Sequence, residues 1–266
     1  MRAVYWGDDG VVATALAEHA DGIHEWPGIG YLEPFPIRLI VTRSARRFDS
    51  LTAGRVPGWS GAAALPAANT IVIKVGPDPF QTLSHEMAHL ALNRVAPRGV
   101  PRWFAEGYAA RAAGEWGRLS VLDVNWALLR GTIPSFGAIN RALRSGPTNA
   151  RAAYALSTTA ILFLERLGGE RGLAPLLANL GETGDLDRAF RRTHLLTLSH
   201  VEALWQRDVR RRYGWLLLTS SLTLFWGLTA VLVGLVWWRR RRRDRVRKAA
   251  LDVGWELPSD EPPDVA

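Results

Sequence analysis

The feature that most constrains this chain is the stretch Ser84-His85-Glu86-Met87-Ala88-His89-Leu90, which reads His-Glu-x-x-His within an apolar run. Two histidines four residues apart lie about 40° apart around a helix, so both imidazoles point into one space. That arrangement suits a tetrahedral zinc ion that keeps an open position for water. Glu86 follows the first histidine directly, where it can accept a proton from a water at the metal. A five-residue pattern also arises by chance, so its context decides its meaning.

The sequence around the motif predicts a helix. Asp78 is placed to be the N-cap, Pro79 fits the first helical position, and Gln81 completes a capping box. The face away from the histidines is apolar, and it carries Phe80, Leu83, Met87, Leu90 and Ala91. We therefore expect an amphipathic helix that packs against a sheet.

A second motif supplies a further carboxylate. Pro101 opens another predicted helix, which contains Trp103-Phe104-Ala105-Glu106-Gly107-Tyr108-Ala109. The turn at Pro97-Arg98-Gly99 lets this helix fold back on the first. Glu106 is then expected near the metal, as a third ligand beside the two histidines.

The two motifs in this order, His85-Glu86-x-x-His89 and Trp103-x-x-Glu106-Gly107-x-Ala109, resemble the gluzincin metallopeptidases, specifically the bacterial peptidase MA-like group. The resemblance covers roughly residues 35–170. It implies Zn²⁺ held by His85, His89 and Glu106, with Glu86 as the general base and a peptide or protein as the substrate.

One position departs from the pattern of the gluzincins. Thermolysin-like members carry an Asp four residues after the ligand Glu, bonded to a zinc-ligating His. Here that position is Ala110, so support for the histidine must come from elsewhere. Asn93, one turn after His89, is a weak candidate, and a helix-terminal Asn is the alternative.

The resemblance raises two further expectations. Some gluzincins use a tyrosine from a later helix to stabilise the tetrahedral intermediate, and Tyr154 is placed for that part; a packed aromatic is the alternative. A strand just before the metal helix commonly borders the cleft. Residues 58–65 or 70–75 would then bind an extended peptide by strand addition, and an ordinary sheet edge is the alternative.

The pattern of elements predicts an α+β fold, with a small N-terminal mixed sheet packed on the His-Glu-x-x-His helix and an all-helical lobe after it. We expect a metallopeptidase domain over residues 1–213, with the sheet part at about 1–77 and the helical part at 78–213. Because the chain has no cysteine, disulfides and thiolate zinc sites are excluded. Strands are predicted at 3–6, 37–42, 58–65 and 70–75, and helices at 9–19, 46–51, 121–129, 136–143, 151–167, 172–180, 186–192 and 199–213.

Residues 215–238 contain no charged residue. A helix of this length reaches about 36 Å, which is enough to cross the roughly 30 Å hydrocarbon core of a bilayer. Trp215, Trp237 and Trp238 lie at its ends, where aromatic belts form. We therefore predict one C-terminal transmembrane helix over 214–238, in contact with the lipid bilayer through 215–238. A basic, then acidic and Pro-rich, disordered tail over 239–266 follows it.

The net charge of +8 comes largely from the flanks of this apolar run. Eight Arg or Lys residues lie within 239–248, and four Arg lie within 207–212. This distribution favours a membrane and gives no support to nucleic-acid binding. We expect the chain to cross a bacterial cell membrane once. The positive-inside bias places the tail in the cytoplasm and the catalytic domain outside it. The opening residues lack the apolar stretch of a secretory signal, so we expect an in-frame signal upstream of Met1. The alternative is that the domain stays in the cytoplasm and the tail crosses the membrane.

Three functions fit these patterns. The first is a membrane-anchored zinc metallopeptidase, in which Glu86 activates the attacking water. The second is a non-catalytic gluzincin-fold module for binding or assembly at the membrane. The third is a membrane-bound regulator acting through its basic tail. All three ligands and the base are present, which favours the enzyme.

Overall fold

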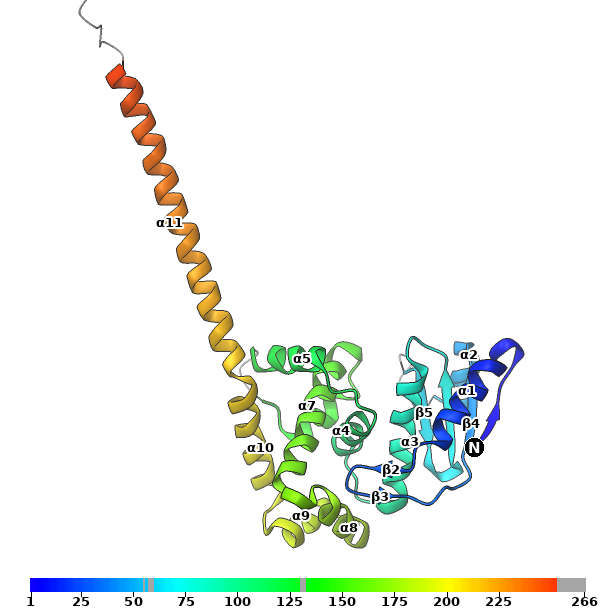
Figure 1. The fold of residues 1–266 in the computed structure, drawn as a ribbon. Helices are drawn as coiled ribbons and strands as arrows, with labels where there is room; N and C mark the ends of the chain where they lie inside the picture. The colour runs from blue at the N-terminus through cyan, green and yellow to red at the C-terminus, as the bar shows by residue number, and fades with distance from the viewer. Residues whose placement is uncertain (55, 57–59, 130–132, 253–266) are drawn as a thin grey trace, which may run out of the picture. The chain divides into compact units, whose positions relative to one another are not determined.

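The computed structural model describes residues 1–54, 56, 60–129 and 133–252 (Figure 1). The chain divides into two compact units, Met1–Trp215 and Leu216–Ala266. The first unit is a mixed α+β structure that is mostly helical, with a small mixed sheet, which confirms the predicted class. Its short 3-10 helices are Gly7–Asp9, Pro66–Ala68 and Gly169–Arg171.

The main sheet has four strands in the order β1-β4-β6-β5. β1 pairs with β4, and β4 with β6, in parallel; β5 pairs with β6 antiparallel. β5 is therefore an edge strand, whereas β6 is paired on both sides. Of the two stretches considered for peptide addition, 58–65 or 70–75, the second is excluded, because β5 covers that side of β6. The strands are β1 (Arg2–Val4), β4 (Arg38–Thr42), β5 (Ala62–Leu65) and β6 (Thr70–Lys74).

Helices cover this sheet because its strands carry aliphatic side chains that must leave water. Leu39, Val41 and Ile71 to Ile73 are fully buried. Phe48, from α2 (Ala45–Thr52), packs with Ala63 and Val72 in one core cluster. α1 (Gly10–Asp21) and α3 (Pro79–Val95) also contact the sheet.

A two-stranded hairpin, β2 (Glu25–Trp26) and β3 (Gly30–Tyr31), lies outside the main sheet and was not predicted. It docks on the helical lobe, since the Tyr108 hydroxyl donates to the Pro27 carbonyl at 2.9 Å. Gly28 also lies against Leu173, where a β-carbon would collide with the Leu173 side chain. Tertiary contacts therefore hold this hairpin in place.

α3 begins as the sequence predicts, with one difference. The Asp78 side chain accepts from the Gln81 backbone N–H at 3.1 Å, which makes Asp78 the N-cap. The capping box is wrong, because the Gln81 side chain donates instead to the Ala113 carbonyl at 3.4 Å. Gln81 therefore links the start of α3 to the end of α4 (Arg102–Ala112).

The helical lobe packs around α4 and α7, which lie against each other. Its aromatic core is a stack in which the Trp103 and Phe136 rings lie 3.9 Å apart and the Phe136 and Trp205 rings 4.9 Å apart. The remaining helices of this lobe are α5 (Arg118–Leu129), α6 (Phe136–Ala142), α7 (Pro147–Leu167), α8 (Ala174–Thr183), α9 (Leu186–His194) and α10 (Leu198–Tyr213).

At the start of α10, Ser199 and Glu202 have the spacing of a capping box but do not form one. The N-cap is Thr197, whose hydroxyl accepts from the His200 N–H at 3.2 Å. Glu202 accepts instead from the Phe136 N–H at 2.8 Å. Its carboxylate therefore satisfies a backbone donor at the start of α6, a contact between elements that no local pattern encodes.

The second unit is formed by α11 (Trp215–Asp252). The basic run 239–248, predicted as part of a disordered tail, is helical here, which agrees with the high helix propensity of Arg, Lys and Ala. The acidic end of the predicted tail, 253–266, lies outside the described residues. Among the residues described, no helix is both long and apolar enough to cross a membrane. The side chains of 215–224, which begin the predicted span, also lie outside that description.

Candidate metal centre

α3 presents His85 and His89 on one face, as the four-residue spacing requires. Their ring centroids lie 4.9 Å apart in an edge-to-face arrangement. The opposite face buries Leu83, Met87 and Leu90, which fixes the rotation of the helix. The two imidazoles therefore face a common space because packing of the apolar face leaves them no other direction.

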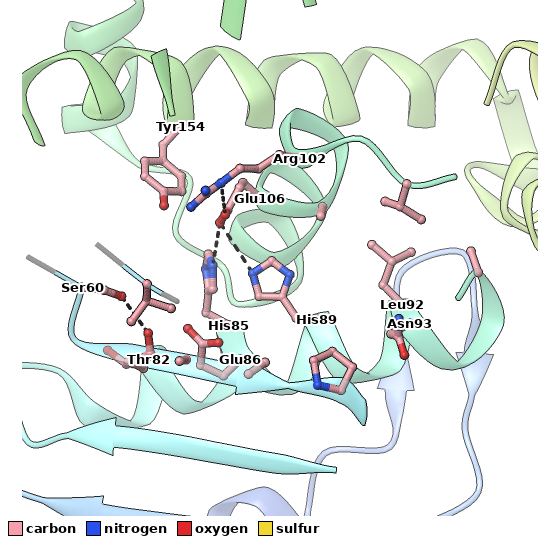
Figure 2. Close-up of a pocket in the computed structure, with 18 of the residues that line it drawn as sticks. Ser60, Thr82, His85, Glu86, His89, Leu92, Asn93, Arg102, Glu106 and Tyr154 are labelled. Atoms are coloured by element: carbon pink, nitrogen blue, oxygen red, sulfur yellow. Dashed lines mark hydrogen bonds and ion pairs between the residues drawn. The ribbon is translucent and has the colours of Figure 1, made fainter. Parts of the chain in front are cut away.

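Glu106 reaches the same space from α4 (Figure 2). Its Oε2 lies 3.5 Å from His85 Nε2 and 3.6 Å from His89 Nε2, and the three candidate ligand atoms all lie within 4.8 Å of one another. Ligands about 2.1 Å from a tetrahedral zinc ion are roughly 3.4 Å apart. The three residues therefore form a group that could bind a metal, with two imidazoles and one carboxylate as donors.

Arg102 holds the other oxygen of the Glu106 carboxylate. Its Nε donates to Oε1 at 3.2 Å, one helical turn before Glu106 on α4. The Glu106 side chain is only 11% exposed, and a buried carboxylate is costly unless both oxygens have partners. Arg102 therefore orients the carboxylate so that Oε2 is the atom that faces the histidines.

Glu115 is a residue of this centre that the sequence reasoning missed. Its Oε1 lies 2.8 Å from His85 Nδ1. A carboxylate at Nδ1 favours the tautomer with its proton on that nitrogen, which leaves Nε2 as the ligand atom. The expected support for the histidine therefore comes from Glu115, rather than from Ala110 or Asn93.

The only local signal for Glu115 is the turn that ends α4. Gly114 has φ of 69°, in the left-handed region that glycine favours, and the Glu115 N–H donates to the Ala110 carbonyl at 2.9 Å. This turn reverses the chain and points the Glu115 carboxylate back toward α3. A single acidic residue after a glycine is too common to identify from sequence alone.

Charge and burial act in opposite directions on two of these groups. Burial by itself lowers the pKa of His85, but its contacts with Glu106 and Glu115 outweigh burial and raise that pKa well above its ordinary value. Burial by itself raises the pKa of Glu106, but the two histidines hold it well below its ordinary value. Glu106 is therefore an anion at neutral pH, as a metal ligand must be.

Glu86 and Tyr154 complete the predicted set. Glu86 is buried on α3, and Figure 2 shows it beside His85. Tyr154 points from α7 toward Arg102 and Glu106 in the same view. Burial and the nearby Glu106 charge raise the pKa of Tyr154 above its ordinary value, so its hydroxyl stays protonated and can donate a hydrogen bond.

The family follows from comparison with known proteins. The family model described as the peptidase MA superfamily matches residues 30–211. The chain belongs to the peptidase MA superfamily. Neither the curated proteins nor the solved structures contain a match to it.

In this peptidase MA chain, all five residues predicted to form the site line one cleft of about 650 Å³. They are His85, Glu86, His89, Glu106 and Tyr154. Ala62 to Ala64 of the edge strand β5 also line the cleft, as do Gly61 just before that strand and Glu115. The structure thus brings the predicted residues together, while the role of each stays a prediction.

Proposed function

We propose that the chain is a membrane-anchored zinc metallopeptidase of the gluzincin type. The observation that carries this proposal is the convergence of His85, His89 and Glu106 at the spacing of tetrahedral zinc ligands, with Glu86 in the same cleft. Membership of the peptidase MA superfamily supports peptide-bond hydrolysis as the reaction class.

In this proposal His85, His89 and Glu106 hold the ion. When bound, zinc supplies a Lewis acid that polarises a carbonyl and lowers the pKa of water. Glu86 accepts a proton from the attacking water, whose oxygen bonds to the scissile carbonyl carbon. Glu86 then gives the proton to the leaving amine as the C–N bond breaks. The protonated Tyr154 hydroxyl donates a hydrogen bond to the carbonyl oxygen as negative charge develops on that atom.

The cleft also supports an extended peptide as the substrate. β5 is at the edge of the sheet, and Gly61 to Ala64 line the cleft. A peptide lying along this strand would add to the sheet through main-chain hydrogen bonds, which are independent of its side chains.

Removal of metal tests the reaction directly. Treating the purified full chain with a chelator should abolish cleavage of a mixed peptide library, and adding zinc should restore it. Magnesium should not restore cleavage, because two of the three ligands are imidazoles, which zinc binds well, whereas magnesium prefers oxygen ligands. Cleavage products would be identified by mass spectrometry. Unchanged cleavage after complete removal of metal would contradict a metallopeptidase.

The membrane anchor is supported by sequence. Residues 215–238 have no charge, tryptophans lie at both ends, and basic residues are more numerous after the span than before it. We propose a single crossing of a bacterial cell membrane by this span. The catalytic domain is then outside the cytoplasm and residues 239–266 are inside it.

Reporter fusions test this orientation. A reporter active only outside the cytoplasm should stay silent when fused after Ala266. It should be active when fused within residues 1–213. An active reporter at Ala266 would reverse the topology and place the cleft in the cytoplasm.

A further inference from the structure

We propose that Trp116 is a positioning residue of the metal centre, which ties the hydrogen bond on His85 to the C-terminal end of α10. The inference rests on the proposed metal site and extends it to residues that do not touch the ion. Two contacts carry it. Glu115 bonds His85 at 2.8 Å, and the ring of its neighbour Trp116 packs edge-to-face on Tyr213 at 6.0 Å.

Glu115 is held by a turn rather than by a helix. His89 and Glu106 are positioned by rigid helices, whereas the partner of His85 Nδ1 comes from the turn between α4 and α5. The backbone secures one side of that turn through the Glu115 N–H to Ala110 at 2.9 Å. Among the described residues, the other side has the bond from the Val121 N–H to the Gly117 carbonyl at 3.2 Å and two longer bonds through the Ser120 hydroxyl, at 3.3 Å to the Glu115 carbonyl and 3.4 Å from the Gly117 N–H. Bonds of that length are weak.

Packing of the Trp116 ring secures the weaker side of this turn. Trp116 is partly buried and meets Tyr213, the last residue of α10. α10 is itself fixed to the lobe, because Trp205 is fully buried and Asp208 pairs with Arg166 of α7. The contact of the Trp116 ring with Tyr213 therefore restrains the turn that carries Glu115 relative to α10, which is itself fixed.

The consequence is that one ligand of three depends on the end of α10. A shift at Tyr213 would move Trp116, and with it the carboxylate that orients the His85 ring. Because His89 and Glu106 do not use this contact, its loss should weaken metal binding without abolishing it. Tyr213 is also two residues before the proposed membrane span, so the contact connects the centre to the segment nearest the bilayer.

The test is a double-mutant cycle on the full chain, with zinc affinity measured by chelator competition and the ligand field by cobalt(II) absorption. Glu115→Gln should weaken zinc binding about 10–100-fold, the usual cost of losing such a partner. Trp116→Ala and Tyr213→Ala should each weaken it several-fold and alter the cobalt spectrum. Trp116→Phe should retain most of the affinity, because phenylalanine preserves an edge-to-face contact.

Non-additivity is the deciding result. Adding Trp116→Ala to Glu115→Gln should cost no further affinity, because Trp116 acts through Glu115. The matched control is Trp6→Ala, which removes a partly exposed tryptophan that packs on Arg47 in the sheet part of the unit and should leave zinc affinity unchanged. Thermal unfolding of each metal-free variant reports whether it folds. If Trp116→Ala does not fold, the variants Trp116→Phe and Tyr213→Ala still test the contact.

Additive losses, or wild-type affinity in both Trp116→Ala and Tyr213→Ala, would overturn the positioning role. A loss of zinc affinity in Trp6→Ala equal to that in Trp116→Ala would overturn it too. Failure of the proposed function looks different, because the wild-type chain itself would then bind no zinc.

Discussion

Replacing Glu86 with glutamine should reduce peptide hydrolysis at least ~100-fold while the protein keeps its metal. Glutamine has nearly the same shape, but it cannot accept the proton of the attacking water, and a general base commonly contributes 10²- to 10⁴-fold. Glu86 is buried in the cleft but is not one of the three ligand residues that converge, so metal content should not change. Hydrolysis and metal content would be measured on the same preparation.

The control for this variant is Glu182→Gln, which makes the same chemical change at an exposed carboxylate of α8. It should hydrolyse peptides like the wild type. If the wild type and Glu86→Gln process every peptide in a library equally, the enzyme proposal fails. The non-catalytic module, with the same fold and metal, would then be the better account.

Replacing Glu106 with alanine should cost more metal affinity than any change outside the three ligands. The substitution removes the only anionic ligand and leaves two histidines, which hold zinc poorly. We expect a loss beyond the ~10–100-fold that removal of a supporting partner causes. His89→Ala should show a similar loss. Metal analysis after dialysis and competition with a chelator would measure both.

The comparison with Glu106→Gln separates charge from shape. The amide retains the length of the side chain and one oxygen, but it lacks the negative charge that opposes the positive ion. Its affinity should lie between those of the wild type and Glu106→Ala. Full zinc occupancy in Glu106→Ala or in His89→Ala would contradict the assignment of these residues as ligands.

Those features of the fold that depend on nearby residues could be predicted from sequence. The helix of the histidine motif and its Asp78 cap follow from residues within one or two turns, and the structure has both. The α3–α4 pairing could be predicted because a short turn forces two successive helices together. Glu106 therefore arrives where the motif spacing indicates.

The features that were missed depend on contacts between distant residues. Glu115 reaches His85 across 30 positions, and Glu202 reaches Phe136 across 66. The β2–β3 hairpin is held by Tyr108, 81 positions from Pro27. No local pattern carries such information, because each contact exists only after the helices have packed. The same reason explains why support for His85 could be expected but not assigned to a residue.

The close packing of α4 on α7 depends on Gly107, the glycine that follows the ligand carboxylate. Gly107 has helical φ, so its backbone conformation does not require glycine. A β-carbon at this position would collide with the backbone carbonyl of Ser157 on α7. In the Glu-Gly pair, the first residue thus contributes chemistry and the second sets a distance between two helices. A side chain at 107 would have to separate those helices and carry Glu106 away from the histidines. The motif therefore specifies how closely two helices pack as well as which residue acts in the reaction.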